Sequence, residues 1–224
     1  MIRKIVNITL AVLALPMAAG LSRAFASEAG NITLLLDKKV VVFAAGVVAY
    51  AVLHLFLIRP SFLYVFGHEL VHAIATFFSG GKVYSFHASR SSGRVKTSKT
   101  NAFIELSPYF VPFYTLILHF LVPVVRYKLA EYRLFYPYMF VAGYTLGMHL
   151  VMNADCLKMR QPDLKRSGYF FSLVVIYVAN LLVVLFLLTF VTRDISFGDF
   201  WAKGIRFSGD NYAYIWQSVM RFVG

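Results

Sequence analysis

The chain has 224 residues, of which 59% are hydrophobic and only 14% are charged. This composition excludes an ordinary soluble protein and indicates an integral membrane protein, with room for about six membrane-spanning helices and short loops. The net charge of +12 comes from basic residues scattered between hydrophobic runs. Such scattering favours the lipid bilayer over nucleic acid as the partner of these charges. The single cysteine, Cys156, excludes an internal disulfide.

Two hydrophobic runs open the chain. The first, 5–21, follows the basic pair Arg3-Lys4 and ends near Ala24-Phe25-Ala26. A basic start and small residues at the end fit a cleavable signal peptide, but the run also fits a first transmembrane helix, which is the preferred interpretation. The second run, Val40 to Ile58, carries no formal charge and is long enough to span a membrane.

A third helix is predicted from about Pro60 to Ser79, and it carries the motif His68-Glu69-Leu70-Val71-His72. Residues four apart share one face of an α-helix, so both imidazoles can bind one metal ion. Histidine pairs with this spacing bind zinc, and the glutamate then acts as general base on a water molecule. Ionisable groups are costly in hydrocarbon, which favours a functional site over a chance match on a buried helix. Gly80-Gly81 is a typical helix end.

The polar segment Lys82 to Thr100 alternates on either side of Ser91-Ser92-Gly93, which predicts a β-hairpin. A fourth hydrophobic stretch, Phe103 to Val125, is interrupted by prolines at 108, 112 and 123, which predict a kinked or partly unwound element. Further helices are predicted at about 134–152 and 168–191. The tail from Arg193 mixes aromatic and charged residues in a pattern typical of an interfacial segment.

The predicted fold is therefore an all-α polytopic membrane protein with about six transmembrane helices and a small polar β-hairpin-like loop after the HExxH helix. Three parts follow from these runs. Residues 1–39 form an N-terminal hydrophobic segment, 40–192 a membrane-embedded core, and 193–224 an interfacial C-terminal tail.

A catalytic zinc needs a third protein ligand besides His68 and His72. If the spans alternate, Asp163, His149 and Asp155 lie on the side of the membrane that His72 approaches, and we favour Asp163. Each has a structural alternative. Asp163 follows Gln161-Pro162 and suits the first turn of a helix, His149 suits an interhelical hydrogen bond, and Asp155 suits the membrane interface. Asn180, a lone polar residue in the last predicted span, either joins helices or orients an extended substrate.

With these residues in place, the chain resembles the site-2 protease family of intramembrane zinc metalloproteases, especially small bacterial members without a PDZ domain. The resemblance covers roughly Val40 to Leu188. It rests on Gly67-His68-Glu69-Leu70-Val71-His72-Ala73, Ser79-Gly80-Gly81-Lys82-Val83, Gly147-Met148-His149, Arg160-Gln161-Pro162-Asp163-Leu164, Gly168 and Phe171-Ser172. Asp163 is followed by leucine where the family has glycine, and the family's Asn-Pro pattern is absent.

The resemblance implies that residues 40–192 are a metalloprotease core in a bacterial inner membrane. It implies zinc on His68 and His72, an aspartate from a later helix as third ligand, and Glu69 as the group that activates water. Asp163 is the nearest match to that aspartate. The substrate would then be another membrane protein.

The predicted reaction is hydrolysis of a peptide bond at or just inside the membrane. A transmembrane substrate must unwind first, and the Lys82–Thr100 hairpin could hold the extended strand by backbone pairing. Two other functions use the same residues. One is an ion- or proton-coupled transporter, which an inverted repeat would favour, and the chain has no such repeat. The other is a zinc hydrolase acting on lipid.

Overall fold

The computed structural model describes residues 2–32, 37–56, 61–128, 134–159 and 161–223, and these are mostly helical. The chain forms two compact units, which we call the site unit (35–166) and the terminal unit (1–34 with 167–224). The helix predicted at 168–191 belongs to the terminal unit. Ile58 and Pro60, at predicted helix ends, and Arg160 of the later motif lie outside the described residues.

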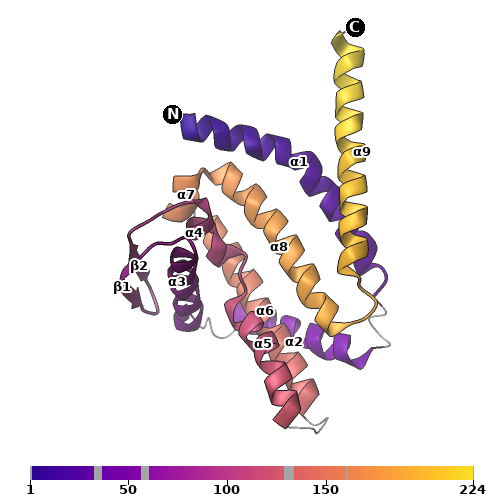
Figure 1. Ribbon diagram of the computed structural model, residues 1–224. Helices are drawn as coiled ribbons and strands as arrows, with labels where there is room; N and C mark the ends of the chain where they lie inside the picture. The colour runs from indigo at the N-terminus through magenta and orange to yellow at the C-terminus, as the bar shows by residue number, and fades with distance from the viewer. Residues whose placement is uncertain (1, 33–36, 57–60, 129–133, 160, 224) are drawn as a thin grey trace. The chain divides into compact units, whose positions relative to one another are not determined.

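The site unit runs from helix to hairpin and back to helix (Figure 1). Its elements are α2 (Lys38–Phe56), α3 (Ser61–Phe78), β1 (Val83–Ala88), β2 (Gly93–Thr97), α4 (Ala102–Leu106), the 3-10 turn η1 (Ser107–Tyr109), α5 (Phe113–Lys128), α6 (Phe135–Lys158) and α7 (Pro162–Ser167). The terminal unit contains α1 (Ile2–Ala29), α8 (Tyr169–Val191) and α9 (Phe197–Val223).

Four helices among the described residues are long and apolar enough to cross a membrane, namely α1, α2, α3 and α8. A bent pair, Ala102–Tyr109 with Phe113–Leu121, would add a fifth if it forms one span, and its two parts meet at 75°. This bend confirms the predicted break near Pro108 and Pro112. α6 coincides with the predicted fifth span, but its composition is less apolar and it is not one of the four. The described residues thus offer four or five candidate spans, fewer than the six expected.

Helix α3 ends where the glycine pair predicts. Gly80 has a φ of 69°, a left-handed conformation that glycine adopts without strain. The amide of Gly81 donates to the carbonyl of Thr76 over 2.9 Å, which closes the last turn. The chain then enters β1, which pairs antiparallel with β2 in the register Phe86 to Val95. The predicted hairpin is therefore confirmed, and it packs against α3 (Figure 1).

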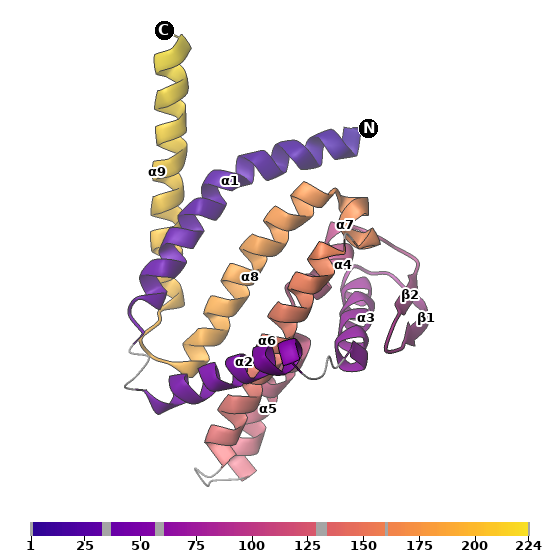
Figure 2. The same cartoon turned by 180° about the vertical axis from the view of Figure 1, so that it is seen from behind.

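Helices α2 and α6 cross at very short distance because glycines face the opposing backbone (Figure 2). A Cβ on Gly46 would collide with the backbone at Phe140, and a Cβ on Gly143 would collide with the backbone at Phe43. Small residues permit such close helix packing in membrane proteins. The contact with α2 holds α6 in place, and the C-terminal half of α6 lies beside the candidate site.

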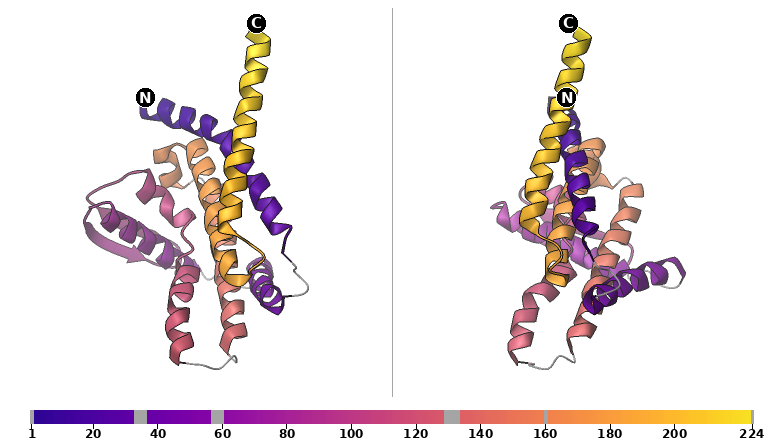
Figure 3. Two further views of the ribbon diagram at one scale, coloured as in Figure 1. Left: turned by 45° about the vertical axis from the view of Figure 1, so that its right-hand side comes forward. Right: turned by 90° about the vertical axis from the view of Figure 1, so that its right-hand side faces the viewer.

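In the terminal unit, α1 packs along α9 and α8 (Figure 3). Leu21, Ala24 and Phe200 belong to its apolar core. A buried carboxylate, that of Glu28, is paired with the ammonium of Lys203 at 2.7 Å. The predicted tail is largely the helix α9, which exposes several aromatic side chains, namely Trp201, Tyr212, Tyr214 and Trp216. Its contact with a membrane interface stays a prediction.

Candidate metal centre

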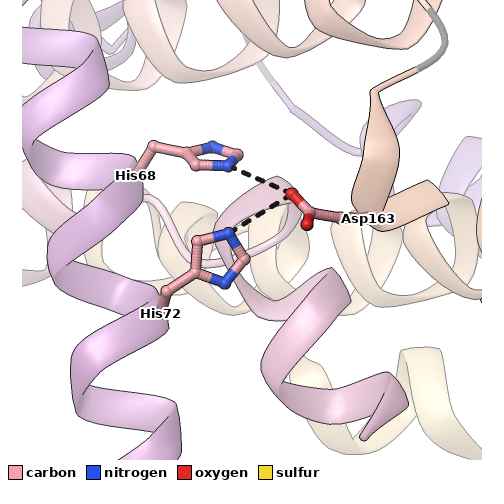
Figure 4. A group of neighbouring side chains, drawn as sticks. All are labelled: His68, His72 and Asp163. Atoms are coloured by element: carbon pink, nitrogen blue, oxygen red, sulfur yellow. Dashed lines mark ion pairs between the residues drawn. The ribbon is translucent and has the colours of Figure 1, made fainter. Parts of the chain in front are cut away.

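The structure brings together His68, His72 and Asp163, which the sequence nominated as metal ligands (Figure 4). One ligand atom from each of the three lies within 4.8 Å of the other two. Asp163 Oδ2 is 3.4 Å from Nε2 of His72 and 4.0 Å from Nε2 of His68. The predicted convergence of these side chains is therefore observed. Their binding of a metal stays a prediction.

Local structure explains how the three side chains meet. The two histidines are one helical turn apart on α3, and their rings pack edge to face at 4.9 Å. Asp163 stands in the first turn of the short helix α7, directly after Pro162. Its neighbour Leu164 is fully buried and anchors α7. The carboxylate is thus presented to α3 from a separate element of the same unit.

The separations of the three ligand atoms can be compared with those around a tetrahedral metal ion. With zinc–ligand bonds near 2.0–2.1 Å, ligand atoms at the corners of a tetrahedron are about 3.3 Å apart. The separation of 3.4 Å between His72 and Asp163 matches this edge. The 4.0 Å between His68 and Asp163 and the 4.8 Å limit of the group exceed it, so the side chains would have to move closer together to hold such an ion. Two imidazole nitrogens and one carboxylate oxygen are also donors that zinc accepts.

A backbone carbonyl orients His72. Nδ1 of His72 lies 2.7 Å from the carbonyl oxygen of Ile104, which can only accept a hydrogen bond. Nδ1 therefore carries the proton, and Nε2 is left with its lone pair directed towards Asp163. Such outer-shell bonds fix the tautomer and the ring plane of metal-binding histidines.

His68 is positioned by packing instead of by a comparable hydrogen bond. Its ring meets Tyr109 edge to face at 5.0 Å and Tyr64 at 5.7 Å. Nδ1 of His68 is buried and has no hydrogen-bond partner among the described residues. Its other nitrogen, Nε2, faces Asp163 at 4.0 Å.

Glu69 is buried beside the two histidines and contacts the hairpin. Only 9% of its surface is exposed. A Cβ on Gly93 of β2 would collide with the Glu69 carboxylate, so glycine at this position lets the strand lie directly over the side chain. The position of Glu69 is consequently set by the hairpin as well as by α3.

These residues line one cavity of about 850 Å³. Its wall is formed by α3, the hairpin, the start of α4, the end of α6 and α7, all in the site unit. A volume of this size is typical of ligand-binding sites. The four residues His68, Glu69, His72 and Asp163 therefore share one cavity of ligand-binding size.

The charge on Asp163 is favoured by its surroundings. Burial opposes ionisation, but the imidazoles of His68 and His72 hold the pKa of the Asp163 carboxyl well below its usual range. The carboxylate is thus charged at neutral pH and available as a ligand.

The alternative ligands lie outside this cluster. His149 accepts a hydrogen bond from Asn153 over 3.0 Å, and both residues lie on α6, so this bond is within one helix and is not the predicted interhelical one. Asp155 lines the cavity but pairs with His54 at 2.9 Å and Lys158 at 3.4 Å. Asn180 lies on α8 in the terminal unit and donates to the carbonyl of Ile176. Its role in substrate binding stays a prediction.

Sequence reasoning missed three supports of the site. Asn153 accepts from Tyr64 and donates to the carbonyl of Tyr109, which ties α6 to α3 and η1. The spacing of His149 and Asn153 on one helix face was a visible signal for this network. The carbonyl of Ile104 and the contact at Gly93 involve backbone, so residue types offered no signal for them.

The described residues form a mostly helical protein with several helices long and apolar enough to cross a membrane, and a His–His–Asp cluster and an adjacent glutamate lie in one cavity. No protein-family model, curated protein or solved structure matches the chain.

Proposed function

We propose that this protein is a zinc peptidase that hydrolyses peptide bonds of membrane-tethered proteins. One observation carries the proposal. His68 and His72 on α3 meet Asp163 from α7 in a single cavity, and Glu69 lies in the same cavity. Three potential ligands with a neighbouring carboxylate are the set that hydrolytic zinc sites use. The apolar helices of both units support a membrane location.

In this function, His68, His72 and Asp163 would hold a zinc ion. When bound there, zinc would polarise the scissile carbonyl and lower the pKa of a coordinated water. Glu69 accepts a proton from the attacking water and passes it to the departing amine. The hydrogen bond from His72 to Ile104 keeps the imidazole in the tautomer that can bind metal.

The hairpin gives the cavity a wall suited to an extended peptide. Residues 90–95 and Thr97 line the cavity, and β2 lies directly over Glu69. A substrate helix hides its peptide bonds in internal hydrogen bonds and must unwind before hydrolysis. An adjacent strand can stabilise the unwound segment by backbone pairing.

The test is the substitution Glu69→Gln in the full chain. Glutamine keeps the size of the side chain but cannot accept the proton. Cleavage of a single-span membrane reporter should fall by about 10² to 10⁴-fold, as removal of a general base does. Zinc content, measured by mass spectrometry on purified protein, should stay at the wild-type level. Full cleavage by Glu69→Gln would exclude the proposed role of Glu69, and absence of zinc from the wild type would exclude the zinc peptidase.

A further inference from the structure

Three arginines border the cavity that contains the His–His–Asp cluster. Arg90 and Arg94 come from the hairpin, and Arg166 comes from α7. All three are exposed, and none forms an ion pair within the described residues. The cavity mouth therefore carries cationic groups from two separate elements that have no anionic partner in this part of the chain.

The acidic residues of the same cavity are engaged elsewhere. Asp155 is paired with His54 and Lys158. Glu105 is 3% exposed and accepts a hydrogen bond from Thr100 at 3.0 Å. The other two carboxylates belong to the proposed catalytic site. The three arginines are therefore available to bind an anionic ligand that is not part of the described chain.

We propose that the cavity selects substrate segments that carry glutamate or aspartate beside the cleaved bond, with Arg90, Arg94 and Arg166 as their binding partners. This inference rests on the proposed peptidase function and names its substrate class. The arginine fork matches a carboxylate by two parallel hydrogen bonds. The three arginines border one concave site, which favours a ligand inside the cavity over lipid headgroups along a flat face.

Binding of peptides to the full-length protein tests the inference. The Glu69→Gln form, in phosphatidylcholine nanodiscs, is titrated with a fluorescent extended peptide that has two glutamates and with its two-glutamine counterpart. The glutamate peptide should bind about tenfold more tightly at low salt, and the preference should shrink at high salt. In the Arg94→Gln, Arg166→Gln double variant the preference should fall to about twofold or less.

The matched control is Lys165→Gln, which removes an exposed cation from α7 that does not line the cavity. It should keep the full preference. Replacing Arg94 and Arg166 by glutamate should reverse the preference towards a two-lysine peptide, a result that a misfolded protein cannot produce.

Equal binding of the two peptides by the parent protein would overturn the inference, as would equal effects of Lys165→Gln and of the arginine substitutions. An unchanged peptide preference, combined with loss of co-purifying phosphatidylglycerol in the arginine variant, would assign the arginines to lipid and also overturn it. The assay needs no cleavage. A preserved binding preference without any hydrolysis by the wild type would therefore count against the peptidase alone and in favour of the acidic ligand.

Discussion

Nδ1 of His72 lies 2.7 Å from the carbonyl oxygen of Ile104, at the last turn before η1 and the bend between α4 and α5. The bent segment formed by Ala102–Tyr109 and Phe113–Leu121 therefore also contacts the candidate site. It supplies the carbonyl that accepts a hydrogen bond from Nδ1 of His72 and leaves Nε2 facing Asp163. The hydrogen bond thus links the bent segment α4–α5 to the orientation of His72 on α3.

The first prediction concerns the ligand set. Wild-type protein should carry about one zinc per chain, and Asp163→Ala should lose the metal as strongly as His72→Ala, because two protein ligands hold zinc poorly. His149→Ala is the control and should keep its zinc, since His149 bonds to Asn153 outside the cluster. Metal analysis of the purified proteins decides this. Loss of zinc from His149→Ala together with full zinc in Asp163→Ala would indicate a three-histidine site.

The second prediction concerns Gly93. A Cβ at this position collides with the Glu69 carboxylate, so Gly93→Ala must displace either the side chain or the strand. Cleavage of the membrane reporter should fall by about tenfold to 10²-fold, because small misplacements of a catalytic group are costly. Zinc content should not change, since the three ligands are untouched.

Gly209→Ala is the matched control for Gly93→Ala. A Cβ at Gly209 meets nothing within 4 Å, so cleavage should remain at the wild-type level. Unchanged cleavage in Gly93→Ala would show that the strand does not position Glu69.

The third prediction concerns the crossing of α2 and α6. Gly143→Val places a branched side chain against the backbone at Phe43, where no flexible group can move aside. Overpacking of this kind costs about 1–3 kcal/mol of unfolding free energy. The thermal midpoint in detergent should therefore fall well below that of wild type. Gly198→Val should change it much less, because a Cβ at Gly198 would lie 3.7 Å from its nearest neighbour, Oγ of Ser196.

The fourth prediction concerns pH. Burial disfavours the charged form of Asp155, but hydrogen bonds from His54 and Lys158 outweigh it and lower the pKa of the carboxyl. A lowered folded-state pKa adds stability above the unfolded value of about 3.9, and this stability is lost as the pH falls through the folded value. The difference in thermal midpoint between wild type and Asp155→Asn should be larger at about pH 5 than below about pH 4, where it should shrink. A difference that grows as the pH falls would contradict this pairing.

Local patterns in the sequence determined the features that depend on near neighbours. The four-residue spacing of His68 and His72 puts both rings on one helix face, and the glycine at 80 ends that helix in a left-handed turn. The hairpin and the bend near Pro108 follow equally from residue types that lie next to one another in the chain.

Tertiary structure alone decided which later residue meets the histidines. Asp163 and His149 both had suitable chemistry and were predicted on the same side. The tertiary structure brings Asp163 on α7 to the two histidines on α3, and the cluster does not include His149. Tertiary packing also brings the carbonyl oxygen of Ile104 within hydrogen-bonding distance of Nδ1 of His72. Such contacts join backbone and side chains far apart in sequence, and no short-range pattern of residue types encodes those distances.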